Sequence, residues 1–157
     1  LQDTAYLHYG RHYLRDCYIE GNVDFIFGDA TALLEHCHIH CKSAGFITAQ
    51  SRKTTVETTG FVFFGELQTL LDFLTKNLLE PSGWLIGFDV GRCIITGTGT
   101  GSPYMHLGRP WAPYARVIFA YTWMDHCIMP TGWNNWGNSE NEMSAAIVNT
   151  GYQRTLF

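Results

Sequence analysis

The chain has 157 residues, of which 46% are hydrophobic and 15% charged, with a net charge of −4. This length suits one domain with a real hydrophobic core, and the composition excludes a disordered chain. The acidic balance argues against a nucleic-acid-binding protein, and no apolar run approaches the roughly 20 residues of a membrane-spanning helix.

Many short strands are predicted along the chain. β-branched and aromatic residues form runs at 25–27, 45–50, 60–64 and 116–124, separated by Gly or charged residues. Four further segments each hold a Cys followed within two residues by an Ile. The isoleucines are Ile19, Ile39, Ile94 and Ile128. Recurrence of the same residue types is typical of a parallel β-helix, whose rungs stack like residues inside a solenoid. A β-sandwich is the alternative from strand spacing alone.

One segment departs from this pattern. Leucines between Glu66 and Leu79 fall on one face of a predicted helix, and Pro81, Ser82 and Gly83 end it. Without residues 66–91, GFVFFG would run directly into RCIITGTGTG. We therefore predict a helical insert at 66–91 within a single domain of residues 1–157. A translated intron or gene-model error is preferred to a genuine insertion.

HCHIHC, at residues 36–41, resembles a zinc-binding string. On a strand, however, the three His would share the outer face while Cys37, Ile39 and Cys41 face the core. Zinc would also need ligands from more than one segment. GTGTG, at residues 97–101, lacks a following Lys-Ser/Thr and is expected to be a turn rather than a phosphate loop. Five cysteines leave at least one unpaired within the chain.

Three strings carry charged groups suited to catalysis: Asp3 in QDT, Asp24 in GNVDFIFG and Arg109 in LGRPW. Two carboxylates and a guanidinium are sufficient for ester hydrolysis without a metal. The guanidinium would keep one carboxylate ionised as the nucleophile. The other carboxyl would protonate the leaving alkoxide and then activate water.

The ordered set QDT, GRHYLRDCYIEGNVDFIFG, ITAQSR, GFVFFG, CIITGTG, LGRPW and GWNNWG resembles the plant-type pectinesterases (pectin methylesterases). The resemblance implies an all-β fold, a right-handed parallel β-helix. It also implies hydrolysis of the methyl esters of polygalacturonate to pectate and methanol, in cell wall modification and pectin catabolism. No metal and no cofactor are expected.

The resemblance also implies roles for individual residues. Asp24 would be the nucleophile and Asp3 the general acid and then base. Gln2 would help to hold the oxyanion, and Arg109 would orient Asp24. The aromatic residues expected to line the substrate groove are Tyr6, Phe27, Trp111 and Trp133. For Phe27, which alternates with Phe25, and for Trp133, packing is the alternative.

The chain departs from the family pattern at both ends. The rung upstream of QDT, with a further oxyanion Gln, is missing, and the residues after GNSENE differ. We therefore expect a β-helix that is incomplete at the N-terminal end and at the C-terminal end. The expected enzyme is a secreted cell wall monomer that acts on pectin and can bind a proteinaceous pectinesterase inhibitor. The alternatives are a catalytically impaired pectin-binding fragment and a glycosidase or lyase on the same polymer.

Overall fold

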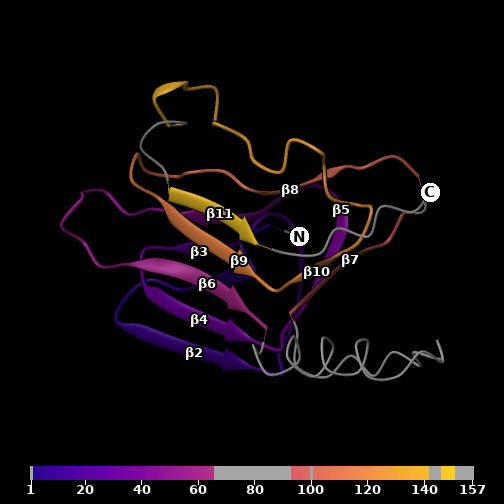
Figure 1. Ribbon diagram of the computed structural model, residues 1–157, viewed down its shortest axis with the longest axis horizontal. Helices are drawn as coiled ribbons and strands as arrows, with labels where there is room; N and C mark the ends of the chain where they lie inside the picture. The colour runs from indigo at the N-terminus through magenta and orange to yellow at the C-terminus, as the bar shows by residue number, and fades with distance from the viewer. Residues whose placement is uncertain (1, 66–92, 100, 142–145, 151–157) are drawn as a thin grey trace, which may run out of the picture.

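In the computed structural model, the described residues are 2–65, 93–99, 101–141 and 146–150, and every named element is a β-strand. All the strand pairs are parallel, and successive strands of a sheet come from successive turns of the chain (Figure 1). The prediction of an all-β parallel β-helix is therefore confirmed. No helix in the described part of the chain is long and apolar enough to cross a membrane.

One side of the solenoid is a five-stranded sheet in the order β11-β9-β6-β4-β2. Its strands are β2 (Arg11–Arg15), β4 (Thr31–Glu35), β6 (Gly60–Phe64), β9 (Arg116–Ala120) and β11 (Ala146–Thr150). Leu14 pairs with Leu34, Leu34 with Phe63, and Phe63 with Phe119, so that one inward column crosses four rungs. Phe63 and Phe119 stack with their ring centroids 4.3 Å apart.

The six-stranded sheet has the order β1-β3-β5-β7-β10, with β8 also paired to β5. Its strands are β1 (Ala5–Tyr6), β3 (Tyr18–Gly28), β5 (His38–Gln50), β7 (Ile94–Gly97), β8 (Met105–Gly108) and β10 (Trp123–Met124). The first half of β5 pairs with β7, and its second half pairs with β8. Because the two halves of β5 pair with different strands, this sheet supplies the two remaining faces of the solenoid.

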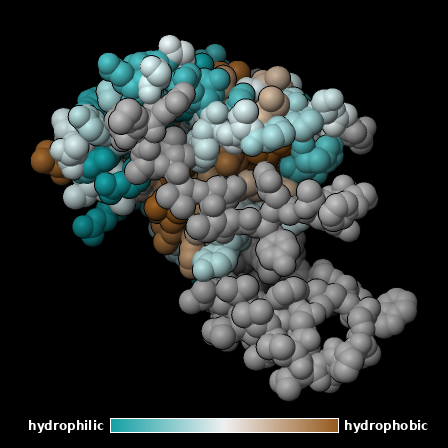
Figure 2. All heavy atoms as spheres, turned by 45° about the horizontal axis from the view of Figure 1, so that its top comes forward, coloured by the Kyte–Doolittle hydropathy of each residue, from teal (hydrophilic) through white to brown (hydrophobic). Residues whose placement is uncertain are grey.

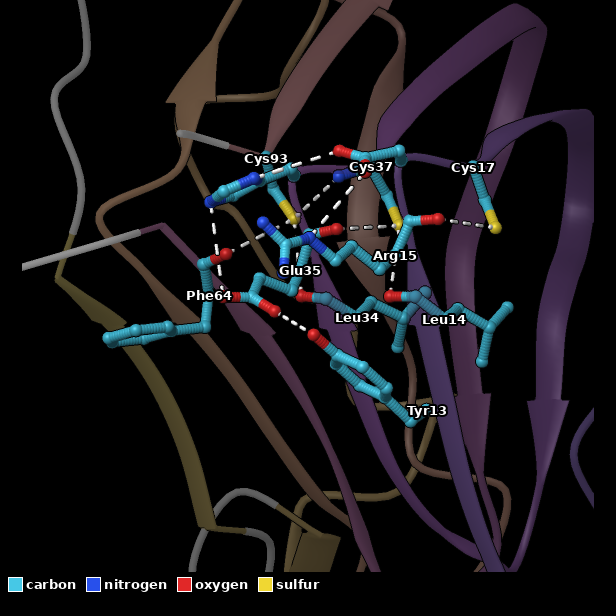
Figure 3. Close-up of polar contacts among 11 residues, drawn as sticks. Tyr13, Leu14, Arg15, Cys17, Leu34, Glu35, Cys37, Phe64 and Cys93 are labelled. Atoms are coloured by element: carbon cyan, nitrogen blue, oxygen red, sulfur yellow. Dashed lines mark hydrogen bonds and ion pairs between the residues drawn. The ribbon is translucent and has the colours of Figure 1, made fainter. Parts of the chain in front are cut away.

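The corner from the five-stranded sheet into the next face takes two residues after β2, β4 and β9. Its first residue, Asp16, His36 or Tyr121, has a positive φ of 53–55°. The second residue is Cys17, Cys37 or Thr122. Cys93, which directly precedes β7, follows Cys17 and Cys37 on the next rung (Figure 3). The thiol of Cys37 donates to Leu14 O, and that of Cys93 donates to Leu34 O.

The predicted Cys–Ile repeat is correct in two of its four segments, at Ile19 and Ile39. Ile19, Ile39 and Ile95 stack in register, with Ile95 in the place predicted for Ile94. The fourth segment is wrong, because Met124 pairs with Ile95 and its rung turns at Thr122. Cys127, which the repeat placed in the corner stack, instead packs beside Gly97.

The zinc-like string is arranged largely as expected. Cys37, Ile39 and Cys41 are fully buried, whereas His38 and His40 lie on the outer face and contact the Thr96 hydroxyl. His36 differs, because it lies in the corner before β5 rather than on the strand. Among the described residues no group of three or more His, Cys, Asp or Glu could hold a metal ion.

The predicted insert at 66–91 lies outside the described residues. The residues on either side of it meet, since the Cys93 thiol lies 3.6 Å from Phe64 O.

Figure 2 shows that the upper part of the described surface is mainly hydrophilic, with a smaller group of hydrophobic residues below it.

Two left-handed glycines allow a matched stability test. Gly10 has φ 77° and open space around an added Cβ, whereas at Gly28 (φ 122°) that atom would lie 2.2 Å from Leu7 O on the neighbouring rung. Gly10→Ala should lower the free energy of unfolding by about 1–2 kcal/mol through backbone strain. Gly28→Ala should cost more, on the order of 3 kcal/mol, because the rung must also move. Urea unfolding of both variants measures the difference, and equal losses would contradict this account of Gly28.

Candidate active site

An ion pair joins Asp24 on β3 to Arg109, which follows β8. Arg109 Nε lies 3.0 Å from Asp24 Oδ1, and Nη2 lies 2.6 Å from Oδ2. Their side chains are only 10% and 21% exposed. The planar guanidinium therefore holds both carboxylate oxygens in one orientation, as a two-pronged charge-assisted hydrogen bond does.

The backbone at Asp24 departs from a regular strand. Between Val23 and Ile26, β3 has one more residue than β5 opposite it, which makes a β-bulge. Asp24 itself has φ 50°. Bulges redirect side chains next to active sites, and non-glycine residues with positive φ often mark functional positions. The expected nucleophile therefore lies at an irregular position of the strand.

Asp3 lies opposite Asp24 on the neighbouring rung. Gln2 forms a bridge with Val23 and Ala5 pairs with Ile26, so the register places Asp3 beside Asp24. Asp3 also has a positive φ, 57°, and it is exposed whereas Asp24 is buried. Two carboxylates thus stand on adjacent rungs in different environments, one paired with a cation and one open to solvent.

Aromatic rings continue the same face beyond the carboxylates. Tyr6 stacks on Phe27 at 4.7 Å between centroids, and Trp111 lies 6.2 Å from Phe27. Tyr6 and Trp111 are about half exposed. Phe25 is fully buried, so it is the member of the Phe25/Phe27 pair that points inward. Such a row can stack against the apolar faces of sugar rings.

A cavity of about 220 Å³ lies at the end of this row. It is lined by Tyr6, His8, Asp29, Ser51, Lys53, Trp111 and Ala112. Asp29 accepts from His8 Nδ1 at 2.9 Å and lies 4.0 Å from Lys53 Nζ. The cavity thus combines aromatic rings with charged groups of both signs.

Trp133 lies apart from the aromatic row. It is partly buried, packs against the core, and its ring centroid is 5.9 Å from that of Phe119. Sequence reasoning missed two other aromatic residues, Phe46 and Trp136, whose rings contact the Arg109 guanidinium. The only available signal was the second Trp of GWNNWG, which follows two turn-forming Asn residues.

A buried arginine supports the loop that carries Trp111. Arg52 is 6% exposed, and its guanidinium donates to the carbonyls of Thr55, Glu57 and Tyr114. Three carbonyl partners satisfy the buried charge, as a buried cation requires. Arg52 therefore ties the loop after β5 to the loop after β8.

Two of the buried thiols, Cys37 and Cys41, are poor nucleophiles. A hydrogen bond with Cys93 and burial raise the pKa of Cys37, and a hydrogen bond with Cys127 and burial raise the pKa of Cys41. Because the thiolate is the reactive form, both groups stay unreactive.

Comparison with known proteins identifies relatives of the chain. The family model "Pectinesterase" matches residues 1–76 and 85–155. Pectinesterase 31 of Arabidopsis thaliana is 58% identical over 146 residues, which are 93% of this chain and 37% of that protein. The pectin methylesterase of Aspergillus niger is 29% identical with a TM-score of 0.69, covering 96% of this chain and 42% of that one. The carrot pectin methylesterase is 25% identical with a TM-score of 0.70, covering 98% and 46%. The chain spans less than half the length of each.

The ion pair can be tested through stability. Arg109→Gln would leave a nearly buried Asp24 carboxylate without its cation, and should lower the free energy of unfolding by about 3 kcal/mol. Adding Asp24→Asn removes the unpaired charge and should restore part of the loss, so the two changes will not be additive. Urea unfolding of both single variants and the double variant measures this coupling. Additive losses would show that the pair contributes little.

Proposed function

Because the chain belongs to the pectinesterase family, we propose that it hydrolyses the methyl esters of pectin to pectate and methanol. The observation that carries the proposal is the ion pair of Asp24 with Arg109, with Asp3 opposite Asp24 on the next rung. The aromatic row beside these groups suits a polysaccharide substrate. Action on pectin would place the protein in the cell wall. Binding of a proteinaceous pectinesterase inhibitor and a monomeric state also stay predictions.

The first half of the reaction forms a covalent intermediate. An oxygen of Asp24, held by Arg109, attacks the ester carbonyl carbon, and the amide of Gln2 donates to the resulting oxyanion. Collapse of the tetrahedral intermediate breaks the bond to the methoxy oxygen, which takes a proton from Asp3 and leaves as methanol. The galacturonyl group is then joined to Asp24 as an anhydride.

The second half restores the enzyme. The Asp3 carboxylate takes a proton from water as the water oxygen attacks the acyl carbon, and the bond to Asp24 breaks. The products are a free galacturonate carboxyl group, the Asp24 carboxylate and protonated Asp3. Tyr6, Phe27 and Trp111 would hold the polymer by stacking on sugar faces. No step needs a metal.

Methanol release from highly methylated pectin tests the nucleophile. Asp24→Asn keeps the size of the side chain and removes its charge, so it should lower kcat by at least about 10⁴-fold. Pectin binding and the circular dichroism spectrum should be unchanged in this variant. Near-normal release by Asp24→Asn would refute the assignment. A folded unsubstituted chain that binds pectin without releasing methanol would instead be a binding fragment.

The same assay tests the absence of metal chemistry. Because two carboxylates and a guanidinium supply every charge that the proposed reaction needs, EDTA at millimolar concentration should leave the rate unchanged. The control is a parallel assay in which the chelator is saturated with calcium, since calcium also acts on the pectate product. Inhibition that a divalent ion reverses, in a substrate free of pectate, would show a metal requirement.

A further inference from the structure

The guanidinium of Arg109 lies between two aromatic rings. Its Cζ is 4.1 Å from the ring centroid of Phe46 and 3.7 Å from that of Trp136. Its Nε and Nη2 donate to Asp24. The cation therefore lies over two π-systems, while its Nε and Nη2 point at the carboxylate.

The ring on one side follows from the rung register. Arg109 follows β8 and Asp24 lies on β3, so the side chain crosses the intervening strand β5 at Phe46. Phe46 in turn stacks on His106 with 5.4 Å between centroids. Burial lowers the pKa of His106, which favours the neutral imidazole beneath the ring.

The ring on the other side comes from a loop in an uncommon conformation. Trp136 has φ 60°, which is rare for a bulky side chain. The loop is held by Asn134, whose N donates to Gly108 O at 3.1 Å and whose Oδ1 accepts from Trp136 N at 2.8 Å. It is thus anchored one residue before Arg109. A strained conformation maintained in this way indicates that the position of the ring matters.

We infer that Trp136 is a positioning residue for catalysis, which holds the Arg109 guanidinium in the plane of the Asp24 carboxylate. This inference rests on the proposed function. The indole attracts the cation to its face and excludes water from one side of the ion pair. Without it, the guanidinium can rotate out of the carboxylate plane and keep only one of its two hydrogen bonds. The nucleophile then loses its orientation toward the ester carbon, although the polymer still binds.

Kinetics of Trp136 variants test this role. Trp136→Leu, which removes the π face, should lower kcat about 5- to 30-fold, the range that one cation–π contact provides, with KM for pectin changed less than about 2-fold. Trp136→Phe should recover most of the rate. Trp123→Leu, on a face without Asp24, is the matched control and should leave both constants unchanged. A raised KM with normal kcat would make Trp136 a sugar-stacking residue and overturn the inference, as would equal losses in the Phe and Leu variants.

A spectroscopic measurement decides the contact without using activity. A proton between two aromatic faces is shielded, so the Arg109 Nε–H signal should lie upfield of other arginines in a ¹H–¹⁵N spectrum of the full chain. Its loss in Arg109→Lys assigns it, and Trp136→Leu should move it downfield. An unshifted signal would overturn the inference, whereas a shielded signal in a chain that releases no methanol would refute only the proposed function.

Discussion

In-register pairing between the parallel strands of successive rungs is the constraint on which the rest of this structure depends. Because Gln2 is bridged to Val23 and Ala5 is paired with Ile26, Asp3 must stand opposite Asp24. The same register repeats inward columns such as Leu34, Phe63 and Phe119. The core and the site are thus two consequences of one ladder, since a shift of one residue would reverse every side chain.

Several departures from that regularity lie at the site. Asp3 and Asp24 both have positive φ, and Asp24 lies in a β-bulge that turns its carboxylate toward Arg109. Trp136 is a further left-handed residue, in a loop fixed to the backbone beside Arg109. The regular rungs supply the stability that such positions lack. The ion pair joins residues two rungs apart, and its guanidinium also contacts the rings of Phe46 and Trp136.

Much of this could be predicted from the sequence, because a solenoid repeats its residue types. The alternation in HCHIHC and the stacking of Ile19 on Ile39 follow from strand periodicity. The fourth Cys–Ile segment misled because Met124 is also apolar and can replace Ile in the column. The contact of Trp136 with Arg109 could not be predicted, since it depends on the turn made by Asn134 rather than on any periodic pattern.

The corner between Phe64 and Ile94 has a consequence for how such a protein can change in length. Elsewhere this corner needs two residues, whereas here 29 residues separate the two strands, yet Cys93 returns to Phe64 as if the corner were short. The entropy of closing a loop grows only slowly with its length. Additional chain at this corner therefore leaves the adjacent rungs in register. A foreign peptide, a fluorescent label or a new pair of termini could be introduced there without disturbing the face that carries Asp24.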